Sequence, residues 1–346
     1  MSSSRAKERC VNSLTGLAFA VAGAPLVRKV FASGADTGLT TVLYHRFFFG
    51  GEPEQAGRER LRRQLGWLRD NYEILSLDDF NKAVQARCFP KRALFITVDD
   101  AKTDLLKVCE DFKSFGVPIT VYVCAGWTAQ TSAIEPGGLW ARAVTDIEWY
   151  DGPEFEITLG SQSRALKIGR AVRAATIDEL LNSRASIEPH LEELISRVEA
   201  MNKKGGAHVI CSWDELKTLQ REGIAFGSHS VGHIKLAAAS DVRLNFAIRE
   251  AKRLIEFQLG PCTSFAYPFG VAGTFDRRTA AIIEDAGFSS AFLTHPGFAQ
   301  PGDDPFHLPR FALPDRHMTG GEFRGRVRGA GVMLRRLKNA VRPSPR

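Results

Sequence analysis

The sequence predicts an α/β protein with a parallel sheet, and two observations support this. Residues 93–98 and 118–124 are short, continuous apolar runs, which are typical of strands buried on both faces. Between them, residues 103–115 have helical apolar spacing and end at Gly116, so the order is strand, helix, strand. The same alternation returns after residue 210 and gives about seven strands, most of them followed by helices.

The elements before residue 128 follow one another in a regular order. Residues 40–45 are rich in β-branched side chains and predict a first strand that ends at His45. Two helices are predicted next, at 58–70 and 75–86. The strand at 93–98 then stops at two neighbouring carboxylates, Asp99 and Asp100.

Residues 128–210 interrupt this alternation. They contain a polar, hairpin-like segment (155–168) and a helix predicted from about Ile177 to Asn202. Thr176 and Glu179 have the spacing of a capping box for that helix. We interpret the region as an insertion over the mouth of the domain, which acts either as a substrate lid or as a packing element.

After residue 210 the alternation of helices and strands resumes. The remaining elements are predicted at 213–221 (helix), 223–227 (strand), 240–259 (helix), 262–266 (strand), 274–286 (helix), 289–293 (strand) and 308–313 (strand). The strand at 289–293 leads to His295.

Composition places the chain among ordinary globular proteins. Of 346 residues, 44% are hydrophobic and 25% charged, which fits one large α/β domain or a domain with an insertion. The six cysteines are scattered and form no C-x-x-C pair, so we expect buried thiols, a reducing compartment and a cytoplasmic location. The alternative is secretion, because basic residues precede a mildly apolar run at 14–27.

The net charge of +7 is concentrated at the C-terminus. Residues 323–346 contain eight Arg or Lys and no acid, so the rest of the chain carries 7 − 8 = −1. This tail is either solvated or a basic amphipathic helix with weak affinity for a membrane surface or another polyanion, and its glycines favour the solvated form. No glycine-rich phosphate fingerprint is present, and we expect no nucleic-acid partner.

Asp99 and Asp100 are the first candidate functional residues. Ligands gather where parallel strands end at their carboxyl side, and adjacent strand residues point to opposite faces. One of the two carboxylates can therefore bind a metal while the other acts as a base. The alternative is that they cap the following helix.

His229 and His233 are the second candidate pair, directly after the apolar run 224–226. They are four residues apart, so one helical turn would place both on the same face. Two imidazoles and one carboxylate form a suitable three-ligand set for Zn²⁺ or a similar divalent ion.

Three motifs occur in a recognisable order: Thr97–Ala101 (TVDDA), His229–His233 (HSVGH) and Phe265–Gly270 (FAYPFG). Together they resemble the polysaccharide deacetylase family, the NodB-homology domain of carbohydrate esterase family 4. The resemblance covers about residues 40–315 and implies a distorted (β/α)7 barrel, here with a helical insertion. The predicted organisation is an N-terminal extension (1–39), the deacetylase domain (40–315, with insertion 128–210) and a basic tail (316–346).

The resemblance also implies a function. Such enzymes remove acetyl groups from N-acetylated sugars of glycans with a bound divalent metal, for which we expect Zn²⁺. Asp100, His229 and His233 match the family's metal ligands, and Asp99 matches its catalytic base. Tyr267, Pro268 and Phe269 match the wall of the substrate groove, and the backbone N–H of Phe269 matches the oxyanion donor.

The general acid of the family lies in a Leu-x-His motif. Both Leu43-Tyr-His45 and Leu293-Thr-His295 have this pattern. Some family members carry the corresponding strand at the front of the domain, and we therefore favour His45, with His295 as the alternative.

Three positions depart from the family pattern. Ala101 replaces the usual Gly, Val98 the usual Phe, and Ala266 the Arg that normally steadies the base. An Ala at position 101 strains a turn that Gly would accept. An alternative function is therefore that of a glycan-binding relative that does not catalyse deacetylation. A deacetylase that acts on a non-sugar amide would share every residue named.

Overall fold

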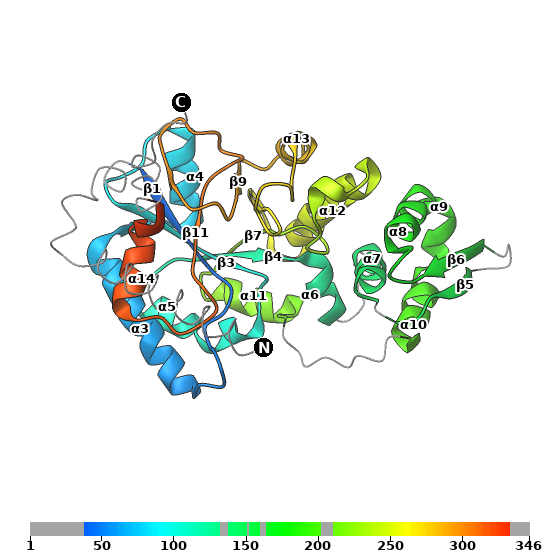
Figure 1. Cartoon of the computed structure of the whole chain (residues 1–346), viewed down its shortest axis with the longest axis horizontal. Helices are drawn as coiled ribbons and strands as arrows, with labels where there is room; N and C mark the ends of the chain where they lie inside the picture. The colour runs from blue at the N-terminus through cyan, green and yellow to red at the C-terminus, as the bar shows by residue number, and fades with distance from the viewer. Residues whose placement is uncertain (1–37, 132–137, 151, 160–163, 202–209, 333–346) are drawn as a thin grey trace, which may run out of the picture. The chain divides into compact units, whose positions relative to one another are not determined.

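The computed structural model describes residues 38–131, 138–150, 152–159, 164–201 and 210–332 (Figure 1). Unit 1 contains the described residues up to Val98, residues 108–120, and the described residues from Thr294 onward. Unit 2 contains residues 99–107 and 121–293. Most of the predicted N-terminal extension and residues 333–346 of the predicted tail lie outside the described residues.

The sheet of unit 1 is built around β1 (Leu39–Tyr44), all six residues of which are buried. β1 runs parallel to β3 (Ala93–Asp99), in register from Thr40 opposite Leu94 to Tyr44 opposite Val98. Three short strands complete the pairing: β11 (Phe311–Ala312) is parallel to β1, β10 (Phe298–Ala299) is antiparallel to β1, and β2 (Glu73–Ile74) is parallel to β3. The apolar run at 93–98, predicted as a buried parallel strand, is thus confirmed as one.

The helices of unit 1 are α3 (Glu54–Asn71), α4 (Leu77–Gln85), α5 (Cys109–Ser114) and α14 (Gly320–Val327). The leucines that predicted α3 form its buried face. Arg58 and Arg62 of α3 both donate to the carboxylate of Asp111 in α5, over 2.7 and 2.6 Å. Because the Asp111 side chain is only 1% exposed, these charge-assisted hydrogen bonds compensate the burial of its charge.

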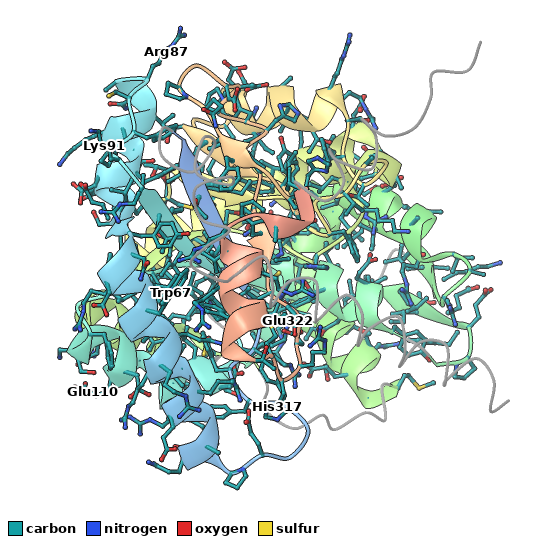
Figure 2. All side chains as sticks on the ribbon, turned by 60° about the vertical axis from the view of Figure 1, so that its left-hand side comes forward. Trp67, Arg87, Lys91, Glu110, His317 and Glu322 are labelled. Carbon is teal, nitrogen blue, oxygen red and sulfur yellow. The ribbon has the colours of Figure 1, made fainter. Side chains whose placement is uncertain are left out.

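Helix α14 corrects the prediction of a solvated tail for residues 323–327. Phe323 and Val327 are buried, and the Phe323 ring packs edge-on against Trp67 of α3 with centroids 5.8 Å apart. Figure 2 shows Trp67 on α3 and Glu322 on α14, where Glu322 pairs with Arg316 and Arg326. This packing stabilises α14 despite the low helix propensity of its glycines. The glycines are visible in the sequence, whereas the residues that α14 packs against are not.

In unit 2, parallel strands again alternate with helices. β7 (Ala225–Ser228) pairs with β8 (Ser264–Ala266), and β8 with β9 (Ser290–Phe292). On its other side β7 neighbours β4 (Thr120–Val123), and the N–H of His229 donates to the carbonyl of Val123 over 2.9 Å. The intervening helices are α11 (Trp213–Arg221), the 3₁₀-helix η4 (Leu236–Ala238), α12 (Asp241–Leu259) and α13 (Arg277–Asp285).

The segment predicted as an insertion is a helical subdomain of unit 2 with one hairpin (Figure 1). The predicted hairpin is confirmed: β5 (Phe155–Leu159) pairs antiparallel with β6 (Arg164–Ile168). The helices are α6 (Ala125–Thr131), α7 (Leu139–Trp149), α8 (Arg173–Asn182), α9 (Arg184–Ile187), η3 (Glu188–His190) and α10 (Leu191–Met201). Arg243 of α12 pairs with Glu148 of α7, and Ser240 donates to Asp178 of α8 over 2.6 Å. These contacts fix the subdomain to α12.

Two predicted helices are interrupted. The helix predicted from about Ile177 to Asn202 is divided into α8, α9, η3 and α10. Pro189, which cannot donate a backbone hydrogen bond, lies in η3 and accounts for the interruption there. Thr176 is no N-cap; it lies inside α8, and its hydroxyl donates to the carbonyls of Lys167 and Val172. The helix predicted at 103–115 is divided into η2 (Thr103–Lys107) and α5, where the chain passes from unit 2 to unit 1.

None of the helices in the described ranges combines the length and the apolar character that a membrane span requires.

The Asp111 cluster gives a test of the stability of unit 1. The two arginines hold the pKa of Asp111 below its usual value, although burial raises it. We expect Asp111→Asn to lower the free energy of unfolding by about 1–2 kcal/mol at pH 7, since both arginines are partly exposed and screened. A carboxyl with a lowered folded-state pKa stabilises the fold above its unfolded pKa and loses this effect as the pH falls. The difference should therefore shrink below about pH 4.

Urea denaturation at pH 7 and pH 3 measures this effect. Asp70→Asn is the matched control, because Asp70 is exposed and lies 3.7 Å from Arg69. Equal unfolding free energies for the two variants at pH 7 would contradict the prediction.

Candidate active site

The predicted metal ligands and the predicted base lie together in unit 2, at strand ends. Asp99 is the last residue of β3 and Asp100 follows it, while His229 comes directly after β7. Asp99 and His229 are each 1% exposed, so the site is buried at this edge of the sheet. The sequence prediction that these segments meet is correct.

The turn after β3 has an unusual backbone. Asp100 and Ala101 both adopt left-handed conformations, with φ of 72° and 51°. Such a conformation costs about 1–2 kcal/mol for a residue with a side chain. Two backbone contacts hold the turn, because Ala101 C=O accepts from Cys211 N–H over 2.9 Å and Lys102 forms a bridge with Ile210. The strain expected from Ala101 in place of Gly is therefore present, and the neighbouring backbone supports it.

The two carboxylate oxygens of Asp100 have different surroundings. Oδ2 accepts from the ammonium group of Lys102 over 2.5 Å. Oδ1 is buried and has no hydrogen-bond partner among the described residues. Burial raises the pKa of Asp100, but the two imidazoles, when protonated, and the ammonium group of Lys102 outweigh it and hold the pKa below the usual value. The residue therefore presents a charged, unpaired oxygen to its neighbours.

His229 presents one ring nitrogen to this oxygen. Its Nε2 lies 3.8 Å from Asp100 Oδ1 and 3.7 Å from Asp99 Oδ2. Its Nδ1 lies 2.7 Å from the carbonyl oxygen of Ala266. Because a carbonyl only accepts, Nδ1 carries the proton and the lone pair of the neutral ring is on Nε2. Metal-binding histidines are commonly held by such an outer hydrogen bond.

His233 reaches the same oxygen by a different backbone path from the one predicted. Residues 229–233 form a turn and not a helical turn, with Ser230 and His233 left-handed at φ of 68° and 53°. The N–H of His233 donates to the hydroxyl of Ser230 over 3.2 Å. The two imidazoles nevertheless lie near the same carboxylate, as predicted, since His233 Nε2 also lies 3.8 Å from Asp100 Oδ1.

Two aromatic rings hold the imidazole of His233. Trp127 stacks on it at 5.2 Å between centroids with an interplanar angle of 29°, and Phe269 approaches edge-on at 4.6 Å. Burial, and the neighbouring charge of His229, lower the pKa of His233 to about 4. The ring is therefore neutral at pH 7, which is the state in which it binds a metal.

The three residues predicted for the substrate groove differ in accessibility. Tyr267 and Pro268 are buried, and the Tyr267 ring packs against Phe265 and Phe275. Their side chains therefore support the loop, and their assignment to the wall of the substrate groove stays a prediction. Phe269 is 44% exposed and left-handed at φ of 62°, so it is the one of the three with a side chain open to a ligand.

The two candidates for the general acid both belong to unit 1. His45 follows β1, is half-buried and lines a pocket with Tyr44, Arg60 and Gln64. His295 is exposed, and its carbonyl accepts from the N–H of Arg310. The assignment of His45, with His295 as the alternative, stays a prediction.

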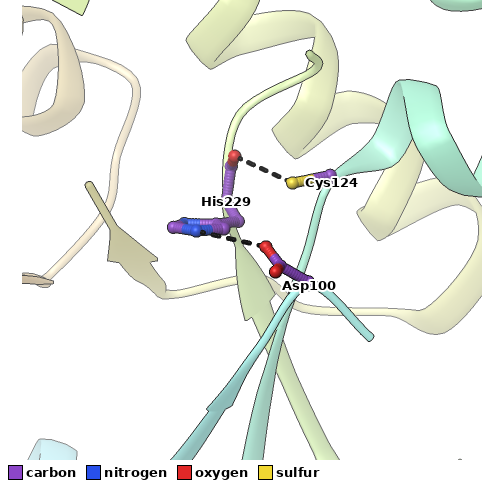
Figure 3. Close-up of side chains that lie close together, drawn as sticks. All are labelled: Asp100, Cys124 and His229. Atoms are coloured by element: carbon purple, nitrogen blue, oxygen red, sulfur yellow. Dashed lines mark hydrogen bonds and ion pairs between the residues drawn. The ribbon is translucent and has the colours of Figure 1, made fainter. Parts of the chain in front are cut away.

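Three further residues of the site were not singled out by the sequence: Lys102, Cys124 and Trp127. Cys124 ends the run that predicted β4, as Asp99 ends that of β3, so its position at a strand end was the available signal. Figure 3 shows its sulfur beside Asp100 and His229, where Sγ donates to the carbonyl of His229 over 3.5 Å. Burial raises the pKa of this thiol well above its usual value.

The residues present fit a divalent metal ion. Asp100 Oδ1 is the unpaired buried oxygen, and the Nε2 atoms of His229 and His233 each lie 3.8 Å from it. Around a tetrahedral ion with bonds of about 2.1 Å, neighbouring donors lie about 3.4 Å apart, so a small closure completes the set.

A comparison with protein families matches residues 86–291 to the family described as polysaccharide deacetylase, which is more than half of the 346 residues. The chain belongs to the polysaccharide deacetylase family. A search of curated proteins finds no match. The family is the one that the three motifs resembled.

Solved structures of other deacetylases are similar in fold. The Streptococcus pyogenes deacetylase PplD in complex with acetate has a TM-score of 0.54 at 16% identity, over 82% of this chain and 95% of that one. IcaB from Ammonifex degensii has a TM-score of 0.52 at 16% identity, over 85% and 97%. A de-N-acetylase from Aggregatibacter actinomycetemcomitans has a TM-score of 0.50 at 13% identity, over 82% and 97%. At these identities the likeness shows the fold, and it confirms the predicted α/β fold class of the deacetylase type.

The start of α6 gives a test of the histidine turn. Gly126 N–H donates to the carbonyl of Val231, which lies between the two histidines, over 2.9 Å. A Cβ at position 126 would meet that carbonyl oxygen at 2.8 Å and the hydroxyl of Thr145 at 2.0 Å. We expect Gly126→Ala to displace the turn and to weaken Zn²⁺ binding at least about tenfold by calorimetry.

Gly232→Ala is the control in the same turn, because the nearest atom to its Cβ would be Ile234 Cγ2 at 3.9 Å. Equal Zn²⁺ affinities for the two variants would show that the turn does not depend on this close approach.

The stacking of Trp127 on His233 gives a second test. We expect Trp127→Ala to free the imidazole and to weaken Zn²⁺ binding about tenfold, a loss typical of residues that orient a metal ligand. Trp127→Phe keeps an aromatic face and should keep most of the affinity. Competition with a chromophoric chelator measures both variants, and an unchanged affinity for Trp127→Ala would contradict a role for the stack.

Proposed function

We propose that this protein is a metal-dependent hydrolase that removes N-acetyl groups from amino-sugar residues of a poly- or oligosaccharide, of the chitooligosaccharide or exopolysaccharide type. The observation that carries the proposal is the meeting of Asp100, His229 and His233 around one unpaired oxygen, with Asp99 beside them. The family assignment supports it. Similar structures include one with bound acetate, which is the product that N-deacetylation releases.

Asp100, His229 and His233 would hold the ion, for which we propose Zn²⁺. When bound, a divalent ion polarises the amide carbonyl and lowers the pKa of water at the site. Asp99 takes the proton from the attacking water, because its carboxylate lies beside the ligand set without being one of its members. The site is buried, so these charges act with little screening.

The remaining roles concern the substrate. The exposed ring of Phe269 offers a flat apolar face for a sugar, and its backbone N–H is proposed as a donor to the oxyanion. The leaving amine needs a proton, and His45 is proposed to supply it as the general acid. The substrate is an N-acetylated glycan.

A second candidate function is a glycan-binding relative without turnover. It is favoured by the strained Ala101 and by Ala266, which cannot steady Asp99 as the usual Arg does. A deacetylase for a non-sugar amide would use the same residues. The weak contact of the basic tail with a membrane surface or polyanion, the absence of a nucleic-acid partner and the cytoplasmic location stay predictions.

Acetate release from N-acetylglucosamine oligomers tests the proposed function. With Zn²⁺ added, we expect release by the unchanged protein and a loss of about 10²–10⁴-fold in Asp99→Asn, since that variant lacks the proton acceptor. Asp99→Asn should still bind Zn²⁺. His229→Ala should lose both the metal and the activity, because it removes a ligand.

His190→Ala is the matched control, since His190 is a half-buried histidine in η3 outside the ligand set. It should keep metal content and turnover. Failure to release acetate with any divalent ion would leave the binding function for this substrate class. Release from a simple acetamide, and none from the oligomers, would indicate the non-sugar deacetylase.

A further inference from the structure

Cys124 places a sulfur donor beside the candidate metal ligands. One donor atom each from Asp100, Cys124 and His229 lie within 4.8 Å of one another, and all three residues are buried. Figure 3 shows the thiol and the carboxylate on the same side of the His229 segment, one above the other in the view. Cys124 directly follows β4 and is 0% exposed, so the thiol is fully buried beside these residues.

Two overlapping ligand sets therefore share Asp100 and His229. The first adds His233, whose side chain is 18% exposed and whose imidazole is a borderline donor. The second adds Cys124, a soft sulfur donor with no exposed surface. Soft thiolates select different ions from imidazole and carboxylate groups, so the two sets differ in the metal that they prefer.

Local contacts leave the atoms of the second set available. Asp100 Oδ1 has no hydrogen-bond partner among the described residues. Cys124 makes one weak contact, its 3.5 Å hydrogen bond to the His229 carbonyl, which a metal–sulfur bond would easily replace. Donors around a tetrahedral ion with a sulfur ligand lie about 3.5 Å apart, so the set must close by roughly 1 Å. Rotation of the short thiol side chain can contribute to this closure.

We propose that Asp100, Cys124 and His229 form a second, softer metal site that captures a thiophilic divalent cation such as Cd²⁺. The S–H bond of Cys124 breaks as the sulfur–metal bond forms, the proton passes to solvent, and no atom changes its oxidation state. The captured ion displaces the one held with His233, because both sets need Asp100 and His229. Its effect on turnover rests on the proposed function: thiolate donation weakens the ion as a Lewis acid, so Cd²⁺ inhibits deacetylation.

Titration with Cd²⁺ tests the proposal by sulfur-to-metal charge-transfer absorption in the ultraviolet. The full-length chain carries Cys10→Ser, Cys88→Ser and Cys109→Ser throughout, because Cys88 is exposed, Cys109 is partly exposed and Cys10 lies outside the described residues, so these thiols could bind Cd²⁺ elsewhere. We expect a band that saturates at one equivalent. Cys124→Ser should abolish it and weaken Cd²⁺ binding at least about tenfold, while Zn²⁺ affinity changes less than about threefold. His233→Ala should keep the band.

Cys262→Ser is the matched control, because Cys262 is also a fully buried thiol but lies outside the cluster. It should keep the band. Cys124→Ala serves as a second variant if Cys124→Ser does not fold. No band in the parent protein, or an undiminished band and Cd²⁺ affinity without the Cys124 thiol, would overturn the proposal.

Acetate release with Zn²⁺ is measured on the same preparations, so the two failures are distinguishable. If the parent protein releases acetate but shows no charge-transfer band with Cd²⁺, the proposal of the second site is wrong and the proposed function stands. A band without acetate release would support the second site and count against the proposed function.

Discussion

The site depends on the charge of one buried carboxylate, that of Asp100. An ionised group inside a protein is costly unless neighbouring charges or donors compensate it. Here Lys102 compensates one oxygen, and the other oxygen faces the two imidazoles without a hydrogen bond. A fold selected for stability alone has no reason to keep such an oxygen unpaired. Its position between His229 and His233 is the one that a cation shared by the three residues would require.

The backbone around this carboxylate is strained, and the strain is concentrated at the site. In the described part of the chain, seven residues other than glycine have positive φ, and five of them belong to the site: Asp100, Ala101, Ser230, His233 and Phe269. Conformations of this kind persist where the surrounding structure determines them strongly. The first turn of α6 provides one such support, because Ala125 and Gly126 donate to the carbonyls of Ser230 and Val231. Thus the same helix start that excludes a side chain at position 126 also fixes the turn that carries both histidines.

The sequence predicted the positions of the strand ends well because buried parallel strands are continuous apolar runs, and their ends are visible as the first charged or imidazole side chains. That is why Asp99, Asp100 and His229 were found together. It could not predict that His233 is reached through a left-handed turn, since the four-residue spacing suits a helical turn equally well. Cys124 and Trp127 were missed because their neighbours, His229 and His233, come from a distant segment. Lys102 was missed because the turn that brings its ammonium group to Asp100, two residues away, is not visible in the sequence. Helix α14 was missed because its glycines are visible in the sequence, whereas its packing on Trp67 is not.

The replacement of the usual Arg by Ala266 affects two functions of the site differently. The carbonyl of Ala266, which any residue would supply, holds Nδ1 of His229 and fixes the ring for metal binding. In the family pattern, the side chain at this position steadies the base, for which we propose Asp99. We therefore expect Ala266 to leave the affinity for the metal unchanged, whereas the rate of deacetylation depends on how Asp99 is held. A chain of this family can in this way keep a complete ligand set whether or not it remains an efficient catalyst, so metal binding and acetate release have to be measured separately.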